Sequence, residues 1–330
     1  MRLAIGIDGG GTKTEAIALR SDALMPEAAI SGLLGPASGT PSSAIVARTA
    51  GLSTNPHAVT FDGAMANLAA LLDALRAEPA AAGAEWDSVV LGLSGVSTDD
   101  EQAAVYRYLE QYKAERGMRF DCAIRNDAQI ALMATLGREE GIIAISGTGS
   151  IISGLTPSGA AYRTGGWGHL LGDEGSGYDI GLRMLKTVMR SYDGILPPTS
   201  MTAALLERLG FASLLELKAY VYQPSVKKSD IAGFAEIAIR ACEAGDPGAT
   251  AVVEACAGEL AAAAVALIRK DGWFTGCDLV MTGSVFKHSP TFAHVFRTHV
   301  AHAYPEIKFH TAEQPPAYGA ALLALKTKRS

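Results

Sequence analysis

The clearest candidate for chemistry is the segment GIDGGGTKTE at residues 6–15, which follows an apolar run at residues 3–5. Three successive glycines leave main-chain N–H groups uncovered, so an anion can approach the backbone closely. Asp8 would repel a bare anion, but it suits a divalent cation that lies between a carboxylate and a phosphate. The segment therefore predicts a site for a Mg²⁺-bound nucleotide.

Other kinds of glycine-rich loop fit residues 6–15 less well. A tight hairpin needs one or two glycines, not three followed by TKT. A GxGxxG dinucleotide loop should open a helix, whereas TEAIAL at residues 14–19 is typical of a second strand. The GK[ST] ending of a Walker loop is also missing. A phosphate-binding loop between two strands is the interpretation that remains.

A second glycine turn, GTGS at residues 147–150, lies between strand-like segments at residues 141–146 and 151–154. It repeats the N-terminal design about 135 residues later, which suggests an internal duplication. Its N–H groups and two hydroxyls could bind phosphate, and the alternative is an ordinary type I′ or II′ hairpin. The similarity to residues 9–14 favours phosphate.

Asp127 follows a predicted strand, in the sequence IRNDA at residues 124–128. A carboxylate at the end of such a strand can reach a cleft, where it could take the proton from an attacking hydroxyl in a phosphoryl transfer. It could equally cap the helix that begins at Ala128. The two roles do not exclude each other.

The segment GGWGHLLGDEGSG at residues 165–177 contains six glycines, yet it also holds an aromatic ring, a histidine and two carboxylates. Carboxylates that accept from hydroxyls, together with an aromatic face, suit a sugar ligand. A flexible surface loop is the alternative, disfavoured by the Trp and Leu-Leu. For His169 a structural role is favoured over a catalytic one.

Two weaker signals complete the candidate residues. Asn55 in GLSTNP (residues 51–56) could bind a ligand or could simply start a turn before proline. The sequence TGS at residues 282–284 follows a predicted strand. Its glycine could let an adenine approach the backbone, or Ser284 could cap a helix.

Strand and helix patterns alternate around these segments, which is typical of an α/β protein. Helices are predicted at residues 64–75 and after a capping box at residues 97–101, the latter with Val105, Leu109 and Tyr112 on one stripe. Strands are predicted at residues 45–50, 89–93 and 277–281, mostly helix at 180–270, and a closing helix after Pro315-Pro316. Residues 21–43 are expected to form a surface excursion.

Composition limits the classes of partner. The chain has 330 residues, 48% of them hydrophobic, which is enough for two domains, and a net charge of −6 that does not suit nucleic acid or an acidic membrane. No uninterrupted apolar run approaches the ~18 residues of a membrane span, and no signal-peptide pattern is present. Four scattered cysteines give no sign of a zinc or iron–sulfur site and are expected to be buried free thiols in a cytoplasmic protein.

Taken together, these motifs resemble the actin-like ATPase and sugar kinase superfamily, and within it the N-acetylglucosamine kinase group of the BadF/BadG-type ATPase family. The resemblance covers nearly the whole chain in order, and the segment at residues 165–177 is its most specific part. It implies two duplicated ribonuclease-H-like α/β domains around a central nucleotide and sugar cleft. The N-terminal lobe would be residues 1–135 joined by the helix at 315–330, and the C-terminal lobe residues 136–314.

The resemblance also implies roles for individual residues. Asp127 would be the catalytic base, and Asp8, at the metal site, would orient Mg²⁺-bound water. The residues implied in sugar binding are Asn55, Asp127, Gly166, Trp167, Gly168 and Asp173. The residues implied in ATP binding are Gly10, Gly11, Thr12, Lys13, Gly147, Thr148, Ala232, Gly283 and Ser284.

The expected activity is ATP-dependent phosphorylation of an amino sugar at its C6 hydroxyl, with N-acetylglucosamine as the leading substrate. Alternatives are a glucosamine or N-acetylmuramate kinase, a regulatory activator ATPase of the same family, and a sugar-sensing protein without catalysis. The activator branch needs cysteines that hold an iron–sulfur cluster, and none lies near Gly147. Relatives imply a homodimer.

Overall fold

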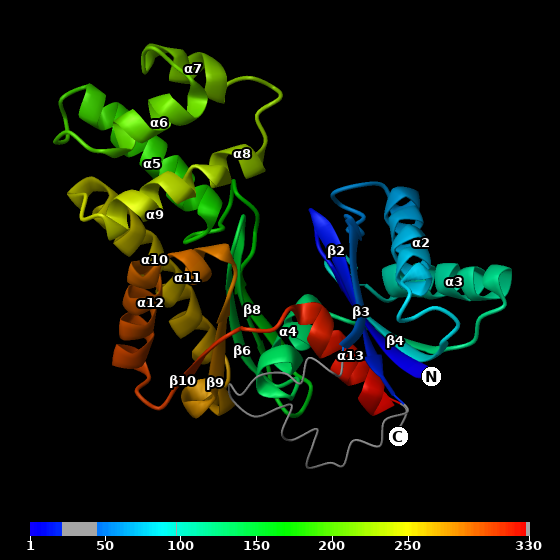
Figure 1. Cartoon of the computed structure of the whole chain (residues 1–330). Helices are drawn as coiled ribbons and strands as arrows, with labels where there is room; N and C mark the ends of the chain where they lie inside the picture. Colours follow the sequence, from blue (N-terminus) through cyan, green and yellow to red (C-terminus); the bar gives the residue numbers. More distant parts are fainter. Residues whose placement is uncertain (22–44, 97, 328–330) are drawn as a thin grey trace. The chain divides into compact units, whose positions relative to one another are not determined.

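The structure is a computed structural model that describes residues 1–21, 45–96 and 98–327. The chain forms two compact units, one of Met1–Glu140 with Ala312–Ser330 and one of Gly141–Thr311. Each unit contains one five-stranded mixed sheet with helices (Figure 1). The surface excursion predicted at residues 21–43 lies, apart from its first residue, outside the described residues.

The first unit contains nine described helices and strands. They are β1 (Arg2–Gly9), β2 (Lys13–Arg20), β3 (Ile45–Leu52), α2 (Phe61–Ala77), β4 (Glu85–Leu93), α3 (Asp99–Arg116), β5 (Asp121–Arg125), α4 (Asp127–Leu136) and α13 (Pro316–Thr327). The predicted capping box is confirmed: the Thr98 hydroxyl accepts from the Glu101 amide, and the Thr98 amide donates to the Glu101 carboxylate. The predicted helices and strands of this unit are therefore all present.

The second unit repeats the sheet and adds more helices. Its elements are β6 (Gly141–Ser146), β7 (Ser150–Leu155), β8 (Ala161–Gly165), α5 (Gly177–Tyr192), α6 (Met201–Leu209), α7 (Leu215–Val221), α8 (Lys228–Gly233), α9 (Ala235–Glu243), α10 (Pro247–Ile268), the 3₁₀ helix η1 (Gly272–Gly276), β9 (Asp278–Thr282), α11 (Ser284–His288), α12 (Pro290–Ala303) and β10 (Lys308–Thr311). The mostly helical segment predicted at residues 180–270 is confirmed.

The two sheets have the same topology, which supports the predicted duplication. The order is β3-β2-β1-β4-β5 in the first and, in the same sense, β8-β7-β6-β9-β10 in the second. In both, the first three strands pair antiparallel and the last two add in parallel. Each of the two glycine turns therefore joins the first and second strands of its own sheet.

The first sheet is covered on both faces. Alternate residues of β1 point to opposite sides: Leu3, Ile5 and Ile7 pack with α2 and α3, whereas Ala4 packs with α4 and α13. Figure 1 shows α13 on one side of this sheet and α2 and α3 on the other. Because β1 is buried on both faces, its end is held rigidly, and that end carries Asp8.

Gly6 allows α13 to lie directly on β1. A Cβ atom at this position would come within 2.0 Å of the Ala321 backbone nitrogen and 2.2 Å of the Ala317 carbonyl oxygen. Both are backbone atoms, so neither can move without displacing the helix. The C-terminal helix is thereby fixed to the strand that ends in Asp8.

We expect Gly6→Ala to lower the free energy of unfolding by about 3 kcal/mol, the upper end of the usual cost of overpacking, because the new Cβ meets backbone atoms. Gly51→Ala is the matched control in β3, where the nearest atom to a new Cβ would be the flexible Leu71 Cδ1 at 3.2 Å. It should cost less than about 1 kcal/mol. Urea denaturation of both variants measures the difference, and equal stabilities would contradict this account of the strand–helix contact.

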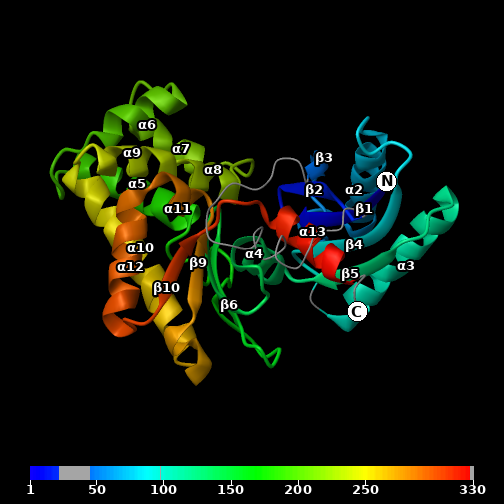
Figure 2. The same cartoon turned by 60° about the horizontal axis from the view of Figure 1, so that its bottom comes forward.

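In the second unit, α10 is a core helix. It packs against α5, α9 and α12 and along β7 and β8, and α10 and α12 lie side by side in both views (Figures 1 and 2). Among the described helices it alone has the length and mean hydropathy of a membrane span, over a window that is 50% buried. Its ten buried side chains, Cys256 and Leu260 among them, explain that apolar composition.

Candidate active site

The predicted residues fall into two groups, one in each unit. In the first unit, the turn between β1 and β2 is closed by a hydrogen bond from the Gly10 amide to the Lys13 carbonyl, at 3.1 Å. Two serine hydroxyls support it from neighbouring segments: Ser53 donates to the Gly10 carbonyl at 3.0 Å, and Ser94 donates to the Gly9 carbonyl at 2.9 Å. The turn is thus held by its carbonyl groups.

The predicted phosphate-binding positions of this turn are accessible. Gly11, Thr12 and Lys13 are exposed, whereas the next residue, Thr14, is fully buried and bonds to Thr54. The turn therefore presents amide, hydroxyl and ammonium donors to solvent, while the residue that follows it is fixed in the core. This is the arrangement that an anion-binding backbone loop requires.

Asn55 lies in the turn after β3 and is fixed on both sides of its amide. Its Nδ2 donates to Ser94 Oγ at 3.1 Å, and its Oδ1 accepts from the His57 amide at 2.8 Å. Through Ser94, Asn55 is connected to the Gly9 carbonyl. Asn55 therefore forms the turn that precedes His57, and it also lies near the glycine turn between β1 and β2.

Asp8 is partly buried at the end of β1, directly opposite Glu15 on β2. Burial raises the pKa of the Asp8 carboxyl to about 6, with further contributions from the negative charges of Asp127 and Glu15, while Lys13 opposes them. Glu15 is itself neutralised by an ion pair with Arg48. A partly buried carboxylate that is poorly stabilised as an anion would gain from a divalent cation.

Asp127 is the first residue of α4, but it is not the helix cap. The cap is Asn126, which forms a capping box with Gln129. The Asp127 carboxylate instead accepts from the Ala128 amide at 2.9 Å. Although the residue is open to solvent, the surrounding protein desolvates its carboxylate, which raises the pKa of Asp127 in spite of that hydrogen bond. An accessible carboxylate with a raised pKa can act as a general base.

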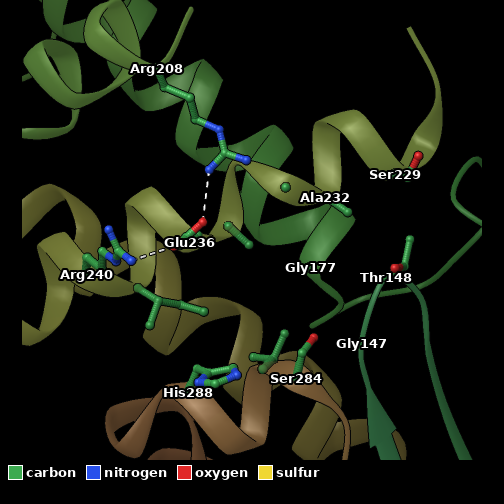
Figure 3. Close-up of a pocket in the computed structure, with 14 residues that line it drawn as sticks. Gly147, Thr148, Gly177, Arg208, Ser229, Ala232, Glu236, Arg240, Ser284 and His288 are labelled. Carbon is green, nitrogen blue, oxygen red and sulfur yellow. Dashed lines mark hydrogen bonds and ion pairs between the residues drawn. The ribbon is translucent and has the colours of Figure 1, made fainter.

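In the second unit, the GTGS turn borders a cavity of about 600 Å³. Four predicted nucleotide-site residues, Gly147, Thr148, Ala232 and Ser284, line it (Figure 3). Its other lining residues are Gly177, Arg208, Ser229, Gly233, Ala235, Glu236, Ile239, Arg240, Val285 and His288. A cavity of this volume is in the range of small-molecule sites.

The two ends of this cavity differ chemically. Figure 3 shows Thr148 and Ser229 at one end, and Arg208 and Arg240 on either side of Glu236 toward the other. Arg208 contacts Glu236 at 3.1 Å and Arg240 contacts it at 2.7 Å. The cavity thus has one end with two hydroxyls, which suit phosphate, and a charged end formed by an ion-paired network.

Gly283 has a structural reason to be glycine. Its φ is 105°, and a Cβ there would lie 2.1 Å from the Ser146 carbonyl oxygen. It stands at the N-cap position of α11 without a side-chain cap, so Ser284 is the first helical residue and faces the cavity. Gly283 itself is not one of the residues that line the cavity.

The segment between β8 and α5 is irregular, as predicted, and presents an exposed apolar tip. Trp167 is 62% exposed, with the Arg163 guanidinium 4.3 Å from its ring centre, and Leu170 and Leu171 are exposed as well. Gly166 and Gly168 have positive φ angles of 69° and 85°. None of residues 166–168 lines the cavity, and His169 makes an edge-on ring contact with Tyr178, a structural role.

Asp173, in contrast, is buried and conformationally unusual. It is the one non-glycine residue with positive φ, 62°, in the described part of the chain. Its carboxylate, only 5% exposed, contacts the Lys228 ammonium at 2.5 Å. Strained backbone conformations held in place by surrounding structure are concentrated at functional sites.

Some residues of these groups were missed from sequence. Ser53 and Ser94 hold the first glycine turn, and Lys228 pairs with Asp173 from 55 residues away. Ser53 occurs in the GLSTNP motif quoted from the sequence, so its proximity to the turn could have been proposed. Nothing in the local sequence of Lys228 signals its partner.

A magnesium ion fits the first unit as a ligand shared with substrate. Among the described residues no group of three or more His, Cys, Asp or Glu side chains forms a cage that could hold a metal ion. Mg²⁺ is commonly held by one or two carboxylates together with phosphate oxygens and water. Asp8 provides such a carboxylate beside the glycine turn.

Comparison with known proteins agrees with this architecture. The N-acetylmuramic acid/N-acetylglucosamine kinase of Clostridium acetobutylicum is 28% identical over 325 residues, covering 98% of each chain. The N-acetyl-D-glucosamine kinase of Dictyostelium discoideum is 29% identical over 340 aligned positions, also covering 98% of each.

The solved structure of a candidate N-acetylglucosamine kinase from Chromobacterium violaceum matches with a TM-score of 0.68 at 22% identity, covering 98% of this chain and 99% of that one. The predicted two-domain α/β fold class is confirmed. Residues 5–324, nearly the whole chain, match the sequence pattern of one family. The chain belongs to the BadF/BadG/BcrA/BcrD ATPase family.

Proposed function

We propose that this protein is an ATP-dependent kinase that phosphorylates N-acetylglucosamine at its C6 hydroxyl. The observation that carries the proposal is the pair Asp8 and Asp127 at the glycine turn of the first unit. One carboxylate is partly buried with a pKa of about 6 and the other is accessible with a raised pKa. A metal-associated carboxylate and a separate base are what a phosphoryl transfer to an alcohol needs.

In this proposal Asp127 accepts the proton of the C6 hydroxyl as its oxygen attacks the γ-phosphorus of ATP. The bond from the γ-phosphorus to the bridging oxygen breaks, and ADP leaves. Mg²⁺, oriented by Asp8, would neutralise charge on the phosphate oxygens. Gly11, Thr12 and Lys13 would donate to phosphate oxygens from the anchored turn. Gly10, whose amide donates to the Lys13 carbonyl, would shape that turn.

The second unit would hold the rest of the nucleotide. Gly147 and Thr148, at the end of the cavity that carries two hydroxyls, would bind phosphate, with Ala232, Gly283 and Ser284 near the adenosine. Thr148 and Ser229 supply the two hydroxyls at the phosphate end. The family description and the cavity volume support this assignment.

Each unit, taken by itself, carries residues that are proposed for sugar binding. Asn55, with its amide held by Ser94 and His57, and the carboxylate of Asp173 are fixed hydrogen-bonding groups. Gly166, Trp167 and Gly168 are proposed to contact the ring, since an exposed indole offers an apolar face.

A sugar panel with a coupled ADP-release assay tests the function. We expect ADP release that depends on Mg²⁺ and on N-acetylglucosamine, and ³¹P and ¹³C NMR of the product should place the phosphate on C6. ADP release that is independent of any sugar would favour an activator-type ATPase. No ADP release with any sugar of the panel would reject the kinase assignment.

N-acetylmuramic acid is a second candidate substrate. The Clostridium acetobutylicum relative, 28% identical, is named for both sugars. The two differ by a lactyl ether at C3, so the panel should include both, with glucosamine as the third member. A kcat/KM for N-acetylmuramic acid equal to or above that for N-acetylglucosamine would extend the substrate class to the bulkier sugar.

An activator role is less well supported by the cysteines. All four are free thiols: Cys242, Cys256 and Cys277 are buried and Cys122 is partly buried. Burial raises the pKa of both the Cys122 and Cys256 thiols, which disfavours the thiolate that a cluster ligand must be. We further propose a cytoplasmic homodimer, which light scattering on the purified protein would test.

We expect Asp173→Asn to weaken N-acetylglucosamine binding by about 10- to 100-fold, because a hydrogen bond to a charged group contributes about 1.5–3 kcal/mol. Asparagine tolerates the left-handed backbone region well, so the 62° φ is preserved and the charge is the main change. Calorimetric titration measures the affinity. Asp193→Asn, an exposed acid at the end of α5, is the control and should bind normally.

A further inference from the structure

Lys228 occupies a position between two parts of the second unit that the proposed function assigns to different substrates. It is the first residue of α8, and the next residue, Ser229, lines the nucleotide cavity together with Gly147 and Thr148. Its ammonium contacts Asp173 Oδ2, in the segment assigned to the sugar, at 2.5 Å. Lys228 therefore connects the sugar segment to the rim of the nucleotide cavity.

The contact lies directly against the second glycine turn. A Cβ placed on Gly149 would be 3.0 Å from Lys228 Nζ and 3.2 Å from Asp173 Oδ2. The cation and the carboxylate thus meet beside the backbone loop that is proposed to bind phosphate. Glycine at this position leaves room for both charged groups.

The two partners are unequally accessible. The Asp173 side chain is 5% exposed and that of Lys228 is 30% exposed. Within the part of the chain that the structure describes, Lys228 is the one side chain that donates to the Asp173 carboxylate. A buried carboxylate needs a compensating partner, whereas a lysine with part of its stem in solvent can change partner by rotating.

We propose that Lys228 couples sugar binding to nucleotide binding by exchanging partners. In the ligand-free protein its ammonium compensates Asp173. When sugar hydroxyls donate to Asp173, the ammonium is released toward the adjacent turn, where it pairs with a nucleotide phosphate. This inference rests on the proposed function and assigns Lys228 as a positioning residue for that reaction.

The exchange predicts positive cooperativity in both directions. The sugar replaces Lys228 as the partner of Asp173, and the nucleotide phosphate replaces Asp173 as the partner of Lys228. Each ligand should therefore tighten the binding of the other by the same factor. It also means that the cation reaches the phosphates only when a sugar has replaced it at Asp173. The Lys228 ammonium would then pair with the phosphates of ATP chiefly when the sugar is bound.

The test is calorimetric titration of N-acetylglucosamine with and without a non-hydrolysable ATP analogue and Mg²⁺. For the parent protein we expect the analogue to tighten sugar binding at least about fivefold, the lower end of typical coupling. In Lys228→Met that ratio should fall to within about twofold of one, and Lys228→Arg should recover most of it, because the charge is restored. A ratio in Lys228→Met equal to the parental one would overturn the inference.

Matched variants separate coupling from structural damage. Lys227→Met removes the same charge from the exposed neighbouring position and should keep the parental ratio. If Lys228→Met does not fold, the double variant Asp173→Asn/Lys228→Met removes both charges and restores neutrality, and Gly149→Ala crowds the pair while both charges remain. Both should lose the coupling, and parental coupling in either one would overturn the inference.

The outcomes also distinguish this inference from the proposed function. A parent protein that binds no sugar and releases no ADP rejects both. A parent protein that phosphorylates the sugar but shows no effect of nucleotide on sugar affinity rejects the Lys228 exchange and leaves the kinase assignment intact.

Discussion

Asp127→Asn is expected to lower kcat for N-acetylglucosamine phosphorylation by about 10²–10⁴-fold, the usual contribution of a positioned general base. Sugar affinity should change by less than about threefold, because the amide oxygen can still accept a hydrogen bond while only the transition state loses proton transfer. Single-turnover kinetics with Mg²⁺ and ATP, together with calorimetric titration of the sugar, separate these two effects.

The pH profile gives this prediction a second readout. Desolvation raises the pKa of Asp127, so the base becomes protonated at a higher pH than an ordinary aspartate would. kcat/KM of the parent should therefore fall on the acid side, as pH decreases through that raised pKa. The residual activity of Asp127→Asn should no longer fall as pH decreases through the pKa of Asp127.

The control for Asp127→Asn lies in the strand that precedes it. Asp121 is an exposed carboxylate at the opposite end of β5, so Asp121→Asn makes the same chemical change away from the glycine turn. It should retain parental kcat. Parental turnover in Asp127→Asn itself would remove Asp127 from the role of base.

Local rules were enough to predict the segments that hold the candidate residues. The capping box at Thr98 and Glu101 and the stripe of Val105, Leu109 and Tyr112 in α3 are satisfied within a single helix. Each glycine turn joins two strands that are adjacent in sequence. Such signals need no information about distant residues, which is why sequence patterns predict them well.

The chemistry of individual side chains depended on contacts that local rules do not contain. At IRNDA, Asp127 was the residue expected as a possible helix cap, but the structure gives the cap to Asn126 and leaves the Asp127 carboxylate accessible. At TGS, Gly283 takes the cap position because β6 approaches so closely that no side chain fits. These are competitions between neighbouring residues, decided by packing.

Long-range pairs were beyond reach for a different reason. The partner of Asp173 is Lys228, which follows it by 55 residues and three helices, and either residue alone is an ordinary charged side chain. By comparison, the pairing of Asp8 with Glu15 across the first hairpin follows from strand register once the turn is known. The distance in sequence between partners therefore separates what could be inferred from what had to be observed.

Asp8→Asn is expected to abolish Mg²⁺-dependent turnover while making the protein more stable at neutral pH. The pKa of Asp8 is raised from 3.8 to about 6, first by burial and then by Asp127 and Glu15. For an acid with a raised pKa, folding favours the protonated form. The ionised carboxylate therefore destabilises the fold above about pH 6, and this cost disappears as pH falls below the unfolded value.

The size of the effect follows from the shift. A difference of about two pKa units corresponds to about 3 kcal/mol at 1.36 kcal/mol per unit, and solvent access to a partly buried group reduces it to roughly 1–3 kcal/mol. Asp8→Asn should thus exceed the parent in free energy of unfolding by that amount at pH 7.5, and the two should converge near pH 4. Urea denaturation at both pH values measures it.

Asp8→Asn should lower activity and raise stability, because the negative charge of Asp8 serves catalysis and not folding. The Asp8 carboxylate is useful when a divalent cation and phosphates neutralise it, and it is unfavourable when they are absent, with Asp127 and Glu15 nearby. Asp121→Asn should show neither change, since its carboxylate is exposed. An Asp8→Asn protein that is less stable than the parent at pH 7.5, or that still turns over with Mg²⁺, would show that this carboxylate is a structural group and not part of the site where phosphate is transferred.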